Sequence, residues 1–164
     1  MTKVSASPRH LTGEDNYFED FVTGQVIRHA RGKTIGEIDN TMFAHLVMNT
    51  AQGHFNEHAM KSTAFGQRVY FGGLTSSLVI GLAAQDTAEN VLAELSVTGI
   101  RLKAMVHHGD TLYAFTEVLE TRNSDRPDAG EVTFRHLGFN QRDELVFEGQ
   151  RRVLMKRRNF GESS

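Results

Sequence analysis

The sequence contains no cysteine. This absence excludes disulfide bonds, metal sites built from thiolates and a cysteine nucleophile. No charge of one sign predominates, because 18 lysines and arginines are balanced by 20 aspartates and glutamates. The resulting net charge of −2 gives no reason to expect nucleic acid or an anionic membrane as a general partner.

Long apolar segments are also missing. The chain starts Met-Thr-Lys-Val-Ser-Ala-Ser-Pro-Arg-His, which has no apolar core and does not look like a signal peptide. The most apolar stretch spans no more than about 14 residues, well short of the roughly 20 that cross a bilayer. We therefore expect a cytoplasmic protein that does not cross a membrane.

Length and composition are those of one globular domain. The chain has 164 residues, of which 39% are hydrophobic and 23% are charged. A domain of this length can bury one sizeable core. We expect a single domain over residues 1–164, with polar termini and an ordered core at about 17–157.

The segment from Phe65 to Asp86 organises the chain, and its second half predicts a helix that begins at Gly72 or Gly73. Apolar side chains cover most of the circumference of this helix, including a line of Leu74, Leu78 and Leu82. Such a helix belongs inside a fold. A second line carries only small residues, which would let a sheet backbone approach closely: Gly73, Ser77, Gly81 and Ala84.

The start of this helix has a feature of its own. The Gly72-Gly73 pair leaves backbone amides free at the positive end of the helix dipole, a place suited to an oxyanion or a polarised carbonyl. The same two residues are also consistent with a plain helix start after a turn.

The rest of the chain predicts one helix and five strands. A strand at 25–35, with charges typical of an edge, precedes a helix at 37–48 and a polar, irregular loop at 49–64. Period-two segments follow the central helix at 93–106, 111–122, 131–140 and 145–156. An α+β hot-dog fold, an antiparallel sheet of about five strands round a buried helix, satisfies this pattern. The free edge of such a sheet predicts a dimer with a continuous sheet.

Two motifs carry a resemblance to a known family. Phe65-Gly-Gln-Arg-Val-Tyr-Phe-Gly-Gly-Leu-Thr and Val106-His-His-Gly-Asp-Thr-Leu are similar to segments of MaoC-like (R)-specific enoyl-CoA hydratases. Asn49-Thr-Ala-Gln-Gly-His-Phe-Asn and Ser77-Leu-Val-Ile-Gly-Leu-Ala resemble, more closely, the mesaconyl-CoA hydratase (β-methylmalyl-CoA dehydratase) branch. Members of that branch often carry two hot-dog units in tandem, so the resemblance implies a single-unit relative.

The resemblance implies a catalytic loop before the central helix. The family's Asp-x-Asn-Pro-x-His motif places its His at His54 and its Asp at Asn49, with Ala51-Gln52 at the central pair. An amide has no useful basicity, so Asn49 can orient water but cannot accept its proton. Gly72 matches the glycine whose amide points at the thioester carbonyl, where hydration builds negative charge.

Three interpretations of the loop stay open. His54 works as the only acid/base, with Asn49 positioning water; or Glu57 or Asp39 replaces the missing aspartate; or the site is silent or does other chemistry. The candidate substrate-binding residues are Gln52, Asn56, Arg68 and Gly73. Arg68 fits a substrate carboxylate or a CoA phosphate in bidentate fashion, and equally a structural ion pair under the loop.

Other candidates are weaker. His54 and His58 have helical metal-ligand spacing but no third ligand, so we expect no metal and no cofactor apart from the CoA of the substrate. His107 and His108 lie in a predicted turn, where exposure to solvent is the default. The basic residues at the end of the chain predict a solvated edge, with contact to CoA phosphates as the alternative: Arg151, Arg152, Lys156, Arg157 and Arg158.

Three functions follow for comparison. The first is a lyase that reversibly hydrates a short, branched or dicarboxylic enoyl-CoA, mesaconyl-CoA being the model, with a homodimer or higher homo-oligomer as its assembly. The second is a hot-dog acyl-CoA thioesterase, which needs a carboxylate such as Glu57 or Asp86 facing the thioester. The third is a non-catalytic acyl-CoA binding module, because Asn49 stands where the family has Asp.

Overall fold

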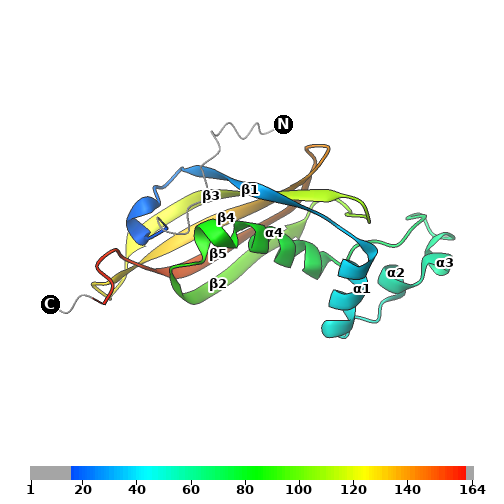
Figure 1. Cartoon of the computed structure of the whole chain (residues 1–164), viewed down its shortest axis with the longest axis horizontal. Helices are drawn as coiled ribbons and strands as arrows, with labels where there is room; N and C mark the ends of the chain where they lie inside the picture. Colours follow the sequence, from blue (N-terminus) through cyan, green and yellow to red (C-terminus); the bar gives the residue numbers. More distant parts are fainter. Residues whose placement is uncertain (1–15, 162–164) are drawn as a thin grey trace.

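The computed structural model describes residues 16–161 and consists of one antiparallel sheet curled round one long helix (Figure 1). The helices are α1 (Glu37–Leu46), α2 (Gln52–Phe55), α3 (Glu57–Met60) and α4 (Gly72–Thr87), with a 3₁₀ turn at Phe18–Asp20. The strands are β1 (Val26–Thr34), β2 (Val91–Leu102), β3 (Thr111–Asn123), β4 (Ala129–Asn140) and β5 (Leu145–Lys156). None of the helices within residues 16–161 is long and apolar enough to span a membrane.

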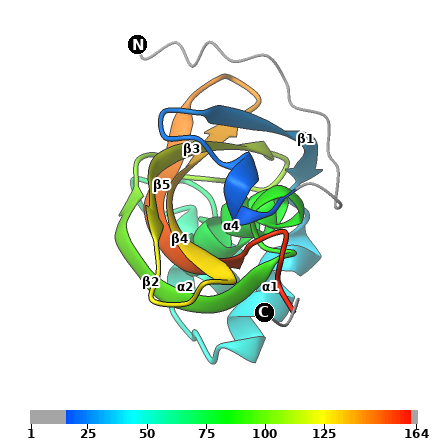
Figure 2. The same ribbon diagram turned by 90° about the vertical axis from the view of Figure 1, so that its left-hand side faces the viewer.

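The five strands form a single sheet in the order β1-β3-β4-β5-β2, with every neighbouring pair antiparallel. The view along the strands shows the sheet wrapping round α4 (Figure 2). The predicted architecture is therefore confirmed, and so is the edge position of the first strand. The other edge is β2, the strand that directly follows α4.

Helix α4 lies against the concave face of the sheet through one side only. Its buried residues are Thr75, Val79, Ala83, Asp86 and Thr87. The line of small residues was expected to face the sheet, and that expectation is wrong, because Ser77 and Gly81 are exposed and a Cβ at Gly81 would meet no atom within 4 Å. The close approach occurs instead at Gly138 of β4, where a Cβ would lie 2.5 Å from the Val79 side chain.

A row of buried polar side chains crosses the inner face of the sheet under the last turn of α4. His29 Nδ1 lies 2.6 Å from Asp86 Oδ2, and His29 Nε2 lies 2.7 Å from Thr116 Oγ1. Thr116 Oγ1 in turn lies 2.8 Å from His136 Nδ1. We call Asp86, His29, Thr116 and His136 the polar row. Burial, together with the nearby Arg151 and His29 charges, lowers the pKa of His136 to about 3, so its imidazole is neutral.

The basic residues near the end of the chain were expected to form a solvated edge, and for Arg151 this is wrong. Strand β5 lies inside the sheet, between β4 and β2, and Arg151 is buried. Its guanidinium donates to Glu94 of β2 (Nε to Oε1, 2.7 Å) and to the Thr87 carbonyl (Nη1, 3.2 Å). This arginine therefore ties the end of α4 to the two strands beneath it.

Three predicted boundaries differ from the structure. The strand expected at 93–106 covers Val91–Leu102, because beyond it the chain leaves the sheet and the Val106 carbonyl accepts from the Tyr70 amide (2.9 Å). The loop at 49–64 was expected to be irregular, yet it contains α2 and α3, the second capped by the Asn56 side chain. Helix α4 has 16 residues, slightly more than expected, because it begins at Gly72 and continues to Thr87.

Candidate active site

The candidate site lies where α1, α2 and α3 gather beyond the end of the sheet, next to the start of α4 (Figure 1). His54 belongs to α2 and is half-buried. Its Nδ1 lies 2.8 Å from the Val69 carbonyl oxygen. Because a carbonyl can only accept, Nδ1 carries the hydrogen, and the neutral ring then keeps its lone pair on Nε2. The Phe71 ring contacts the imidazole edge-on at 5.4 Å between centroids.

Asn40 of α1 connects His54 to the start of α4. Its Nδ2 donates to the His54 carbonyl (3.1 Å), and its Oδ1 accepts from the Phe71 amide (3.0 Å). The side chain is completely buried. Sequence reasoning missed this residue. The available signal was an asparagine, a poor helix former, inside a predicted helix, which favours a specific hydrogen-bonding role.

The first turn of α4 contains amides that have no acceptor within the helix. Phe71 precedes the helix in an extended conformation, and its carbonyl accepts from the amides of Leu74 and Thr75 (2.9 and 3.0 Å). The Gly72 and Gly73 amides belong to the first turn, where N–H groups have no acceptor within the helix. A Cβ at Gly72 would overlap the Leu102 side chain. Glycine here avoids that overlap and lets Leu102 pack against the start of the helix.

Asn49 orders the entry to α2. Its side-chain Oδ1 accepts from the Ala51 backbone amide (3.1 Å), and its backbone N–H donates to the Ala44 carbonyl (2.8 Å). Gln52, two residues before His54, is exposed. Asn56 caps α3, its Oδ1 accepting from the Ala59 amide (2.9 Å).

Arg68 forms structural ion pairs, which the sequence analysis gave as the alternative to substrate binding for this residue. Its Nε donates to Glu57 Oε2 (3.1 Å) and its Nη2 to Glu37 Oε1 (3.0 Å), with only 14% of the side chain exposed. Hydrogen bonds from the Arg68 side chain and amide lower the pKa of Glu57. Glu57 is therefore a weaker base than an ordinary carboxylate, which disfavours it as a substitute for the missing aspartate.

The other carboxylate considered, Asp39, is bound in a similar way. Its Oδ2 accepts from the Gly36 amide (2.8 Å) and pairs with Lys33 (3.1 Å). Partial burial alone would raise the pKa of Asp39, but the Gly36 hydrogen bond and the Lys33 charge outweigh it, and the net pKa is lowered. Both carboxylates are thus weakened as bases, whereas the Nε2 lone pair of a neutral His54 is suited to accept a proton.

Asp86 lies at the far end of α4 from the candidate site. Fourteen residues separate it from Gly72, about 21 Å along a helix that rises about 1.5 Å per residue. Its carboxylate is buried against His29. The thioesterase hypothesis needed Glu57 or Asp86 to face the thioester, and this position separates Asp86 from the candidate site.

The two histidines of the turn before β3 are less exposed than expected. His107 Nδ1 lies 3.3 Å from the Arg68 carbonyl, and its amide donates to Asp110 Oδ2 (2.9 Å). Both ring nitrogens of His108 are buried without a hydrogen-bond partner among the residues of the described range. The turn therefore packs under the loop that carries Arg68.

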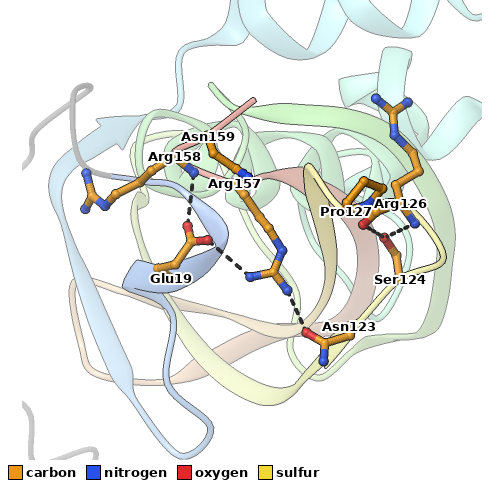
Figure 3. Close-up of a pocket in the computed structure, with 8 residues that line it drawn as sticks. All are labelled: Glu19, Asn123, Ser124, Arg126, Pro127, Arg157, Arg158 and Asn159. Atoms are coloured by element: carbon orange, nitrogen blue, oxygen red, sulfur yellow. Dashed lines mark hydrogen bonds and ion pairs between the residues drawn. The ribbon is translucent and has the colours of Figure 1, made fainter. Parts of the chain in front are cut away.

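A separate hollow of about 600 Å³ lies at the opposite end of the sheet, near the end of the chain (Figures 1 and 3). Its arginines are already engaged: Arg157 donates to Glu19 (3.2 Å) and Asn123 (2.6 Å), and Arg126 forms two hydrogen bonds to Asp128 (both 2.9 Å). None of the candidate catalytic residues lines it. The chemistry inferred for His54 does not belong to this hollow.

Comparison with known proteins gives a consistent set of matches. A family model described as mesaconyl-CoA hydratase matches residues 6–157. A mesaconyl-CoA hydratase of Haloarcula marismortui is 32% identical over 90% of this chain and 44% of its own length. An (R)-specific enoyl-CoA hydratase of Rhodospirillum rubrum is also 32% identical, over 87% of this chain and 94% of its own length.

Among solved structures, a Mycobacterium tuberculosis protein described as a double hotdog fold superposes with a TM-score of 0.79 and 25% identity. The match covers 90% of this chain and 46% of that one. The hot-dog fold predicted from the sequence is thereby confirmed. The chain spans less than half the length of the Haloarcula protein and of this two-unit structure.

Proposed function

This chain belongs to the mesaconyl-CoA hydratase family, and from that premise we propose that it reversibly hydrates a short, branched or dicarboxylic enoyl-CoA thioester. The observation that carries the proposal is the hydrogen bond from His54 Nδ1 to the Val69 carbonyl, which leaves Nε2 as the basic nitrogen. The relative of matching length, the Rhodospirillum enzyme, is named for enoyl-CoA hydration.

In the proposed reaction, His54 Nε2 takes a proton from water while the water oxygen bonds to the β-carbon of the substrate. The electron pair of the double bond moves onto the thioester, whose oxygen becomes negative. The Gly72 amide, with Gly73 beside it, donates to that oxygen. The α-carbon then takes the proton from the imidazolium, which regenerates neutral His54. No cofactor takes part apart from the CoA of the substrate.

Asn49 has a supporting role in this proposal. Because an amide cannot accept the proton of water, Asn49 orients the water and His54 alone carries the proton. A distal carboxylate on a mesaconyl-like substrate would supply the negative charge that aspartate brings in other members, favouring the protonated form of His54. Gln52 is exposed and is the candidate for contact with substrate. Arg68 and Asn56 are engaged in hydrogen bonds of their own, so they would bind substrate only through the atoms that these bonds leave free.

We propose that a second hot-dog unit completes the site, supplied by another copy of the chain. Edge strand β2 and helix α1 expose large apolar side chains: Val97, Ile100 and Leu102 on the strand, and Ile38, Met42 and Leu46 on the helix. Exposed apolar surface of this kind marks an interface. Leu102 also lies directly in front of Gly72. A stable monomer in sedimentation at micromolar concentration would contradict this assembly.

The test is an assay over a small panel of enoyl-CoA and hydroxyacyl-CoA thioesters, with mesaconyl-CoA and crotonyl-CoA included. Change in the enoyl-thioester absorbance reports hydration, and free thiol reports thioester hydrolysis. We expect hydration, and His54→Gln should lower its rate by about 100-fold or more, the usual scale of general acid/base catalysis. Thiol release would favour a thioesterase, binding without turnover a binding module. An unchanged rate for His54→Gln on every substrate would refute the assignment of this loop.

A further inference from the structure

We propose that Asn40 is a positioning residue that holds the base and the oxyanion donor at a fixed separation. The inference rests on the proposed hydration reaction and concerns a residue that does not itself touch substrate. Asn40 lies on α1, outside both the loop of His54 and the start of α4, yet it is hydrogen-bonded to both.

The two hydrogen bonds require an amide side chain. One partner, the His54 carbonyl, needs a donor, and the other, the Phe71 N–H, needs an acceptor. An asparagine supplies both from one planar group, whereas aspartate lacks the donor and alanine lacks both. Because Asn40 is fully buried, water cannot easily take the place of a hydrogen bond that is lost there.

The bonds of Asn40 close a ring of contacts round the imidazole. The Val69 carbonyl accepts from His54 Nδ1 (2.8 Å), and the Val69 amide donates to the Gly53 carbonyl (3.0 Å). The segment 69–71 therefore carries the partner of the imidazole at one end and the start of α4 at the other. Asn40 joins the Phe71 end of this segment to the backbone of His54 itself.

Helix α1 is anchored well enough to act as the fixed point. Its first turn is held by Asp39, which accepts from the Gly36 amide (2.8 Å) and pairs with Lys33 of β1 (3.1 Å). Farther along, the Phe43 ring contacts that of Phe71 at 6.1 Å between centroids. Asn40 therefore connects the site to a helix that is held against edge strand β1.

Fixed separation matters because the base and the donor act on one small substrate in the same step. In the proposed reaction, Nε2 of His54 takes a proton from the water that attacks the β-carbon, while the Gly72 amide donates a hydrogen bond to the thioester oxygen. A misplacement of about 1 Å between such groups lowers the rate by about 100-fold even when both remain present. A loss of alignment of this kind lowers kcat with little effect on KM.

The test uses Asn40→Ala and Asn40→Asp, with matched changes at Asn140. Asn140 is just as buried, and its side chain closes the turn between β4 and β5 by donating to Glu144 (2.9 Å) and accepting from the Arg142 amide (2.9 Å). We expect Asn40→Ala to lower kcat by about 10- to 100-fold, with KM changed by less than about 3-fold. Asn140→Ala should lose comparable stability but keep kcat within about 2-fold.

Asn40→Asp keeps the acceptor for Phe71 and serves if the alanine variant does not fold. Its carboxylate replaces the amide that contacts the His54 backbone carbonyl, and the added negative charge favours the protonated imidazole, so the acid limb of the kcat/KM profile should move to higher pH. Asn140→Asp should leave that limb in place. A purely structural role would lower kcat in both Ala variants in proportion to their lost stability and would move neither pH profile, which would overturn the proposal.

A spectroscopic measurement separates failure of this inference from failure of the proposed function. In ¹⁵N NMR, His54 of the unaltered protein should show a single tautomer with hydrogen on Nδ1, and Asn40→Ala should mix the tautomers while Asn140→Ala does not. If the protein hydrates no enoyl-CoA, the proposed function is wrong, and the NMR comparison still decides whether Asn40 positions His54. An unmixed tautomer in Asn40→Ala would refute the positioning role.

Discussion

Thr116→Val is the sharpest test of the polar row, because it removes one hydroxyl and adds a methyl group of similar size. Thr116 Oγ1 is hydrogen-bonded to two histidines at once, His29 Nε2 at 2.7 Å and His136 Nδ1 at 2.8 Å. All three side chains are buried, and His136 Nε2 has no partner in the described part of the chain. The substitution therefore leaves two further ring nitrogens in a dry interior without a partner.

The expected cost follows from these contacts. A buried polar group that loses its partner costs about 1–3 kcal/mol, and two groups lose theirs here. Burial of the new methyl returns about 0.8 kcal/mol. We therefore expect the free energy of unfolding to fall by about 1–5 kcal/mol. For a chain of this length, that corresponds to a fall in Tm of about 2–20 °C.

Urea unfolding measures this change, and Thr34→Val is the matched control. Like Thr116, Thr34 forms a hydrogen bond through its hydroxyl group, here to the hydroxyl of Thr111 (2.8 Å). Thr34 is exposed, however, so water can replace this bond. The control should stay within about 0.5 kcal/mol of the unaltered protein. Equal stabilities for the two variants would mean that the histidines do not depend on Thr116, and the account of the polar row would be wrong.

Three further predictions concern the site, the pH response and the packing of α4. Asn49→Asp should preserve or raise hydration of simple enoyl-CoAs and weaken binding of a dicarboxylic one through like-charge repulsion, as steady-state kinetics on both substrates will show. The pKa of His136 lies at about 3 when folded against 6.5 when unfolded, so only the unfolded chain gains this proton as pH falls below 6.5. Stability therefore decreases by up to about 1.4 kcal/mol per pH unit toward pH 3, and His136→Gln should flatten that slope in urea unfolding at pH 7.5 and 5. Gly138→Ala should cost about 1–3 kcal/mol by overpacking against Val79, and Val79→Ala in the same chain should recover part of this in thermal unfolding.

The sequence predicts the strands of the sheet interior well. The segments expected at 111–122, 131–140 and 145–156 correspond to β3, β4 and β5 to within two residues. These strands are paired on both sides and have one face toward α4, so buried residues alternate with partly buried ones along much of their length. Strand β2 is an edge strand with exposed residues on both faces, so its pattern does not show where pairing stops.

The parts that sequence reasoning missed depend on contacts between residues far apart in the chain. The alternation of β5 places Arg151 on the same face as the buried Val153 and Met155, but its charge favoured solvent, and the partners that allow its burial, Glu94 and Thr87, lie on other elements. Asn40 has partners 14 and 31 residues away. His54 and Gly72 could be named because a motif places them, whereas the residue that joins them has no motif.

The two ends of α4 have opposite requirements, and the polar row explains how one helix meets both. At its start, the helix has no capping hydrogen bond from a side chain, and in the proposed reaction the Gly72 and Gly73 amides donate to a thioester oxygen. At its other end, Asp86 is bound to His29, and the Thr87 carbonyl accepts from Arg151. These contacts lie about 21 Å from the Gly72 amide. Loss of the polar row should therefore destabilise the protein without touching the chemistry, whereas loss of Asn40 should lower kcat beyond what its cost in stability explains.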